Sequence, residues 1–200
     1  MKTALSILTL ASLLFVTPAI AVPQIGGGAP DFTGTDSTGK KHTLADFKGK
    51  YVVLEWLNHG CPFVKKHYGS DNMQKLQKEF TDKGVVWVSI VSSAPGKQGH
   101  MSPEDTNKTK KEVGSAATAV IIDEDGSIGR LYDAKTTPEI FVIDPKGTLI
   151  YAGAIDSVKS VDPNDIAKST NYVRAALTEA LDGKPVTTAK TTPYGCSVKY

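Results

Sequence analysis

The sequence has few of the residues on which several protein classes depend. Its 200 residues include only two cysteines and four histidines. Two cysteines are too few for a disulfide-rich scaffold, and four histidines leave little for an all-protein metal cluster. Charges nearly cancel, with 23 Lys and Arg against 21 Asp and Glu, and no long run of one sign occurs. Because a nucleic-acid binder normally carries a concentrated basic face, we expect no nucleic-acid partner.

Long apolar runs are lacking after residue 21. Before it, Lys2 gives a positive start, residues 4–16 are mostly apolar, and Ala19 and Ala21 form a small-x-small cleavage signal. We expect residues 1–21 to be a secretory signal peptide, with a buried N-terminal helix as the alternative. The protein is then exported to the periplasm or secreted, without a membrane span, where disulfides can persist.

Between residues 22 and 183, β-branched apolar runs alternate with amphipathic segments. Strands are expected at 51–56, 85–91, 119–122, 140–143 and 148–152. The last two strands are close enough to form a hairpin. Helices are expected at 71–84, 102–114 and 172–183. This order predicts one α/β domain with a central mixed sheet, helices on both faces, and an N-terminal extension before residue 51.

The last segment, residues 184–200, has a different composition. Pro185, Pro193 and four threonines predict an extended C-terminal arm, not a helix. The arm offers few apolar groups to hold it down, so we expect it to be mobile. It carries Cys196, which could therefore travel to meet another group.

Cys61 stands directly after the first expected strand, where a helix should begin. The unpaired N–H groups at a helix start favour a thiolate over a thiol, and His59, Lys65 and Lys66 would add positive charge. We therefore predict that Cys61 is a reactive thiol with a lowered pKa. The alternative is a buried, inert cysteine.

Four segments give the sequence a family resemblance. They are Asn58–Val64 (NHGCPFV), Ser93–Gln98 (SAPGKQ), Thr136–Asp144 (TTPEIFVID) and Gly195–Lys199 (GCSVK). Together they resemble the redoxin branch of thioredoxin-fold proteins (the alkyl hydroperoxide reductase and thiol-specific antioxidant family), and more narrowly its exported peroxiredoxin-like subgroup. The resemblance implies a thioredoxin-like fold, antioxidant or thiol-exchange activity without a cofactor, and a cis bond before Pro138 that turns Thr137 toward Cys61.

The resemblance also assigns candidate site residues. Cys61 and Cys196 are the expected catalytic thiols. The expected substrate-binding residues are Asn58, His59, Pro62, Thr137 and Pro138.

Departures from the family pattern limit the chemistry. Val64 stands where a dithiol thioredoxin has its second cysteine, so Cys61 has no local thiol to resolve a mixed disulfide. Peroxiredoxins carry a proline, a threonine or serine, and an arginine where this chain has Leu54, Asn58 and Pro138. Standard peroxidase chemistry therefore lacks its usual residues.

Several functions remain open. In the leading hypothesis, Cys61 attacks a disulfide or an oxidant and Cys196 resolves the product. Its partners would be thiols or disulfides of proteins or small molecules, and a thioredoxin-type reductant. One alternative is a peroxidase in which hydroperoxides oxidise Cys61 to a sulfenic acid. Another is a binding module with a structural Cys61–Cys196 disulfide. A copper site at Cys61, His59 and His67 is the weakest interpretation, and no metal site is expected.

Glu55 is the polar exception in its apolar strand. Thioredoxins often bury an acid beneath the reactive cysteine, which gives one interpretation. Strand alternation sends Glu55 and Leu57 to the same face, so an outward or edge position is the other.

Overall fold

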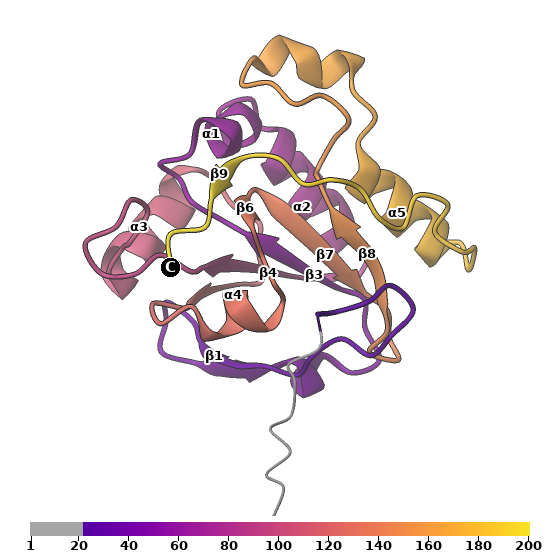
Figure 1. Cartoon of the computed structure of the whole chain (residues 1–200), viewed down its shortest axis with the longest axis horizontal. Coiled ribbons are helices and arrows are strands. Elements are labelled where there is room, and N and C mark those ends of the chain that lie inside the picture. Colours follow the sequence, from indigo (N-terminus) through magenta and orange to yellow (C-terminus); the bar gives the residue numbers. More distant parts are fainter. Residues whose placement is uncertain (1–21) are drawn as a thin grey trace, which may run out of the picture.

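A computed structural model describes residues 22–200 of the chain (Figure 1). The predicted signal peptide, residues 1–21, lies outside the described residues. None of the helices within residues 22–200 has the length and apolar character needed to cross a membrane.

A five-stranded sheet forms the centre of the molecule, in the order β5-β4-β3-β7-β8. The strands are β3 (Val52–Trp56), β4 (Val86–Val91), β5 (Ala119–Ile122), β7 (Glu139–Ile143) and β8 (Leu149–Gly153). The first three run parallel, whereas β7 is antiparallel to β3 and β8 is antiparallel to β7. The predicted mixed sheet is thus confirmed.

Helices connect the strands and close the domain. They are α1 (Pro62–Tyr68), α2 (Asn72–Thr81), α3 (Pro103–Glu112), α4 (Ser127–Leu131) and α5 (Tyr172–Leu181), with 3-10 turns η1 (Leu44–Phe47) and η2 (Pro163–Lys168). Ser102 caps α3 as its sequence indicates, because its side chain accepts from the Asp105 N–H at 3.1 Å. The short helix α4 was not predicted.

Two apolar clusters lie on opposite faces of the sheet, and successive β3 residues alternate between them. Val53 belongs to the cluster that α1, α2 and α5 cover. Leu54 and Trp56 belong to the other, which α4 and the N-terminal segment cover. β3 is the central strand and is buried on both sides, as expected for a sheet with two covered faces.

The N-terminal extension contains a small antiparallel hairpin. Its strands are β1 (Thr33–Thr35) and β2 (Lys41–Thr43). An isolated bridge between Asp36 and Ile121 attaches this segment to β5, at the edge of the central sheet.

The C-terminal arm, residues 184–200, is extended as predicted but is docked in this structure instead of free. It leaves α5, runs beside β8 and ends near α4 (Figure 1). Its strand β9 (Cys196–Ser197) pairs antiparallel with β6 (Thr136–Thr137). Tyr194 is buried and Thr191 bonds through its backbone to Ala152. Backbone pairing and one buried aromatic side chain therefore anchor a segment with few apolar residues.

Candidate active site

Cys61 lies where the central strand meets a helix. The chain leaves β3, turns through residues 57–60, and enters α1 with Cys61 as the residue before the helix and Pro62 as its first residue. Pro is well suited to that position, because its missing N–H would have had no partner within the helix. The Cys61 side chain is fully buried, and Pro62 is exposed at the surface above it.

Asn58 holds the turn before Cys61. Its Oδ1 accepts from the Gly60 N–H at 2.8 Å, and its Nδ2 donates to Gln98 O at 3.1 Å. Gln98 in turn donates to Gly60 O at 3.2 Å. Because Asn58 is buried and its amide is used in these bonds, its visible role is to shape the turn.

The predicted contact between Cys61 and Thr137 is present. The bond between Thr137 and Pro138 is cis, as predicted, and the Cys61 thiol donates to Thr137 O at 3.1 Å. Glu139 supports this loop, since its carboxylate accepts from the N–H groups of Lys135 and Thr136 at 2.7 and 3.0 Å.

The arm brings the second thiol to the first. Thr137 pairs with Cys196 in the β6–β9 register, and the two cysteine Sγ atoms are 2.7 Å apart. Both cysteines are free thiols. The two thiols are therefore side by side, as a bridge between them would require.

All four segments of the family resemblance meet here. Residues 58–64 contact residues 93–98 through Asn58 and Gln98, and Cys61 contacts Thr137. The Ala94 N–H donates to Lys199 O at 2.9 Å, which joins the second segment to the arm. Segments separated by more than a hundred residues therefore form one site at the end of β3.

Opposing effects set the pKa of Cys61. Burial raises the pKa, but hydrogen bonds from the Cys196 thiol, from the backbone N–H groups of Val64 and Cys196, and from the Thr137 side chain outweigh it and lower the pKa below its ordinary value. This direction agrees with the prediction from the sequence. A lowered pKa gives more of the thiolate, which is the nucleophilic form.

Nearby bases are not the main cause of that shift, contrary to the sequence argument. Burial lowers the pKa of His59, so its ring is neutral at neutral pH, and the ring packs edge-on against Tyr68 with centroids 5.0 Å apart. Lys65 is exposed, and buried Lys66 pairs with Asp156 at 3.2 Å. Hydrogen bonds, and not the expected positive charges, therefore lower the pKa of Cys61.

Cys196 shows the opposite shift. Burial, a hydrogen bond with Cys61 and the charge of the Cys61 thiolate raise the pKa of Cys196 to about 11, while Lys199 lowers it. Cys61 is therefore the more acidic thiol of the pair, and Cys196 is the less acidic one.

Glu55 lies in the core below this site, so the outward or edge position was wrong. Its carboxylate accepts four hydrogen bonds of 2.8–3.0 Å, from Tyr68, Gln77, Trp87 and Ser89. Burial raises the pKa of Glu55, and the four donors lower it by less. Its visible role is to tie α1, α2 and β4 to the central strand.

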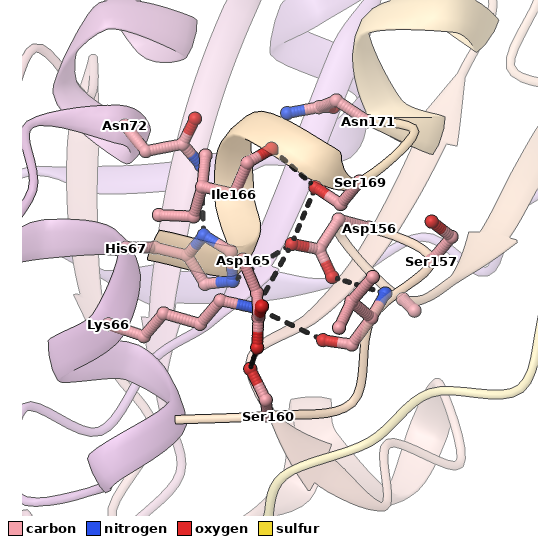
Figure 2. A network of polar contacts seen from close by, with 12 residues as sticks. Lys66, His67, Asn72, Asp156, Ser157, Ser160, Asp165, Ile166, Ser169 and Asn171 are labelled. Carbon is pink, nitrogen blue, oxygen red and sulfur yellow. Dashed lines mark hydrogen bonds and ion pairs between the residues drawn. The ribbon is translucent and has the colours of Figure 1, made fainter. Parts of the chain in front are cut away.

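A second polar cluster lies beside α1 (Figure 2). His67 Nδ1 accepts from the Asn72 amide at 2.8 Å, so the proton is on Nε2, which faces Asp156 at 3.9 Å without a hydrogen-bond partner. These contacts orient His67 toward Asp156. Within residues 22–200, no group of three or more His, Cys, Asp or Glu side chains could hold a metal ion.

Two residues with clear links to the site were missed in the sequence. Tyr194 is buried against Phe63, with ring centroids 5.7 Å apart, and its hydroxyl donates to Asp156. The signal in the sequence was an aromatic residue two positions before Cys196, in an arm otherwise rich in Thr and Pro. Asp156 carried no signal, since it looked like any polar residue after a strand.

Comparison with known proteins gives a consistent family assignment. The model of the AhpC/TSA family matches residues 25–152. The thioredoxin-like protein YneN of Bacillus subtilis is 31% identical over 133 residues, which are 63% of this chain and 69% of YneN. The thiol-disulfide oxidoreductase ResA of Bacillus thuringiensis is 30% identical over 133 residues, 64% of this chain and 68% of ResA.

A solved structure extends the similarity over most of the chain. The crystal structure of an uncharacterized conserved protein from Geobacillus kaustophilus superposes with a TM-score of 0.78 at 30% identity, covering 88% of this chain and 92% of that one. The fold is thioredoxin-like, as the strand and helix order predicts.

Proposed function

Because the chain belongs to the AhpC/TSA family, we propose that it is a thiol–disulfide oxidoreductase in which Cys61 attacks disulfides and Cys196 resolves the product. One observation carries the proposal: two free thiols with oppositely shifted pKa values are 2.7 Å apart at the end of the central strand. The name of ResA supports the same class of reaction.

The reaction has two exchange steps. The Cys61 thiolate attacks one sulfur of a substrate disulfide, whose S–S bond breaks, and the departing half leaves as a thiolate that takes up a proton. The Cys196 thiolate then attacks Cys61 Sγ and releases the second half. The substrate gains two electrons and two protons, and the protein is left with a Cys61–Cys196 disulfide. A separate dithiol protein of the thioredoxin type supplies the electrons that reduce it again.

The pKa of Cys196 favours this order of events. Two of the causes that raise it, the hydrogen bond and the charge, require Cys61 to be a thiolate. Both disappear once Cys61 is joined to a substrate, so the pKa of Cys196 falls. The resolving thiol therefore becomes more acidic, and more reactive, at the step that uses it.

Substrate binding follows from the position of β9. The arm pairs with β6 as an added strand, and we propose that an extended polypeptide can take its place when the arm moves aside. Thr137 and Pro138 then line the slot, and Pro62 is exposed next to Cys61. His59 lies in the turn before Cys61, half-buried against Tyr68. Asn58 contributes indirectly, by shaping the turn before Cys61.

Hydroperoxide reduction has less support. Leu54, where peroxiredoxins carry proline, is buried in the cluster on the face opposite the one that contains Cys61. Pro138 replaces the arginine that polarises a peroxide in those enzymes. A structural Cys61–Cys196 disulfide is the other alternative, and a redox titration separates it from the proposal.

We further propose that residues 22–183 form the redox domain and residues 184–200 an arm that supplies the resolving thiol. Residues 1–21 would direct export and be removed. Export would place the thiols in a compartment where disulfide substrates persist.

Trapping the mixed disulfide tests the mechanism. The Cys196→Ser variant lacks the resolving thiol, so a peptide disulfide should leave half of itself attached to Cys61, detected by mass spectrometry. Wild type should instead proceed to the internal bridge, and Cys61→Ser, the matched control, should capture no peptide in the first minutes. Capture at Cys196 in place of Cys61, or no capture by either variant, would overturn the proposal.

A further inference from the structure

Tyr194 fixes the arm close to the reactive thiol. It is the second residue before Cys196, and its side chain is 7% exposed. The ring packs edge-on against Phe63, and Lys66 Nζ lies 5.8 Å from its centroid. Both of these residues belong to α1, the helix that begins directly after Cys61.

Its hydroxyl is held by a carboxylate that is itself firmly fixed. The Tyr194 hydroxyl donates to Asp156 Oδ1. The other carboxylate oxygen accepts from Lys66 Nζ and from Ser169 Oγ, both at 3.2 Å. Figure 2 shows Asp156 between Lys66 and His67 of α1 on one side and Ser169 on the other. Because Lys66 is also buried and donates to Val158 O at 3.0 Å, the acceptor for Tyr194 is rigid relative to α1.

The short chain between Tyr194 and Cys196 limits how far Cys196 can lie from the fixed Tyr194 side chain. Two residues of extended chain span at most about 7 Å. Gly195 between them adopts φ +150, where its missing side chain lets the arm approach Thr137 O closely. With Tyr194 fixed, the Cα atom of Cys196 stays within about 7 Å of that of Tyr194, which keeps Cys196 near Cys61.

We infer that Tyr194 is a positioning residue that holds Cys196 against Cys61 through its hydrogen bond to the Asp156–Lys66 pair. The inference rests on the proposed function for its meaning, since a resolving thiol must meet Cys61 at high effective concentration. It predicts a split between the two steps of exchange. Loss of the Tyr194 hydroxyl should slow resolution, whereas the attack of Cys61 on an incoming disulfide should be unchanged or faster, because the arm covers Cys61 less firmly.

The test uses Tyr194→Phe, which keeps the ring and removes only the hydroxyl. Tyr51→Phe is the matched control, because the Tyr51 hydroxyl also donates to a protein acceptor, Ala180 O at 2.8 Å, away from the arm. The first measurement is the rate at which diamide, an oxidant that takes two electrons and two protons from two thiols, closes the Cys61–Cys196 bridge. The second is the equilibrium of that bridge in glutathione buffers.

We expect the bridge equilibrium constant of Tyr194→Phe to fall about tenfold, the effect of one hydrogen bond to a charged group. Diamide closure should slow in parallel, and Tyr51→Phe should match wild type in both assays. Equal values for Tyr194→Phe and wild type would overturn the inference. If wild type closes rapidly with diamide and Tyr194→Phe slowly, but neither reacts with a peptide disulfide, the positioning role stands and the proposed function fails.

Discussion

Individual hydrogen bonds shift the pKa values of the two thiols in opposite directions. Burial alone would raise the pKa of Cys61 and make it a poor nucleophile, but four hydrogen bonds reverse the effect on its pKa. The Cys196 thiol is the leading donor among them. The protonation state of one cysteine therefore affects the pKa of the other. The positions of the two cysteines in the sequence could not reveal this coupling.

The donor effect can be isolated with two single-thiol variants. Cys196→Ser keeps a hydroxyl that can donate to the Cys61 thiolate, and Cys196→Ala keeps no donor. We expect the pKa of Cys61 to be lower in Cys196→Ser than in Cys196→Ala, because a hydrogen bond to the charged form lowers a pKa. The rate of alkylation against pH gives both inflections. The same inflection in both variants, or a lower one in Cys196→Ala, would show that the neighbour at position 196 does not stabilise the thiolate.

Gly195 offers a second test at the scale of one residue. A Cβ at this position would overlap the carbonyl oxygen of Thr137, and the backbone has φ +150. Gly195→Ala should therefore displace β9 from β6 and slow closure of the disulfide by tenfold or more. Gly183→Ala is the control, since Gly183 also has a positive φ but nothing within 4 Å of the added Cβ. Equally fast closure in the two variants would contradict this account of the arm.

Among the elements, β3 shows what sequence periodicity can and cannot predict. Alternation correctly places Glu55 on the same face as Val53 and Leu57. It misjudges exposure, because only the strand order reveals that β3 lies at the centre of a sheet covered on both faces. Four donors from α1, α2 and β4 then make a buried carboxylate tolerable.

Replacing that carboxylate should destabilise the fold. In Glu55→Gln, the new NH₂ group faces donors, so at least one buried polar group loses its acceptor. We expect the free energy of unfolding to fall by about 1–3 kcal/mol, measured by urea denaturation. Glu104→Gln, an exposed residue in α3, should change it by less than about 0.5 kcal/mol. Equal stability of the two variants would mean that Glu55 does not organise the core.

Elements with a strong local pattern were predicted, and elements made by distant contacts were not. The five sheet strands and helices α2, α3 and α5 follow from apolar runs, periodicity and caps. Helix α4, Ser127–Leu131, is too short for a periodic signal. Strands β6 and β9 have two residues each and pair Thr137 with Cys196 across the fold, so neither has a local signature.

Across the whole molecule, the arm supplies what the local motif lacks. Val64 stands where dithiol thioredoxins have their second cysteine, and the chain brings Cys196 to Cys61 from its other end instead. Beyond Cys196, the Tyr200 hydroxyl donates to Ala134 O at 2.9 Å, and the Arg130 guanidinium lies 4.6 Å from the Tyr200 ring. The family resemblance placed Cys61, Thr137 and Pro138 together. The anchors Tyr194 and Asp156 could not, because their pairing depends on the complete tertiary structure.

The buried cluster around His67 should make stability depend on pH. Burial lowers the pKa of His67 to about 4, with Asp156 raising it and Lys66 lowering it. The unfolded chain takes up this proton near pH 6.5 and the folded chain only near pH 4, so stability is full above about 6.5 and falls as the pH drops toward 4.

A variant isolates the contribution of this histidine. His67→Gln removes the titrating ring. Between pH 7 and pH 4, the free energy of unfolding of wild type should fall by about 2–3 kcal/mol more than that of the variant. Urea denaturation at a series of pH values gives both profiles. Parallel profiles for His67→Gln and wild type would show that His67 does not carry the pH dependence.

Equilibrium with glutathione tests the central claim, reversible exchange between Cys61 and Cys196, most directly. The purified protein is equilibrated across a series of reduced-to-oxidised glutathione ratios, its thiols are trapped by alkylation, and each state is quantified by mass spectrometry. The account predicts one reversible two-electron transition between the dithiol and an internal Cys61–Cys196 disulfide, within the range that glutathione can buffer. A bridge that resists reduction, with a potential below about −300 mV, would identify a structural staple, and the absence of any bridge under oxidising conditions would contradict the two-thiol mechanism itself.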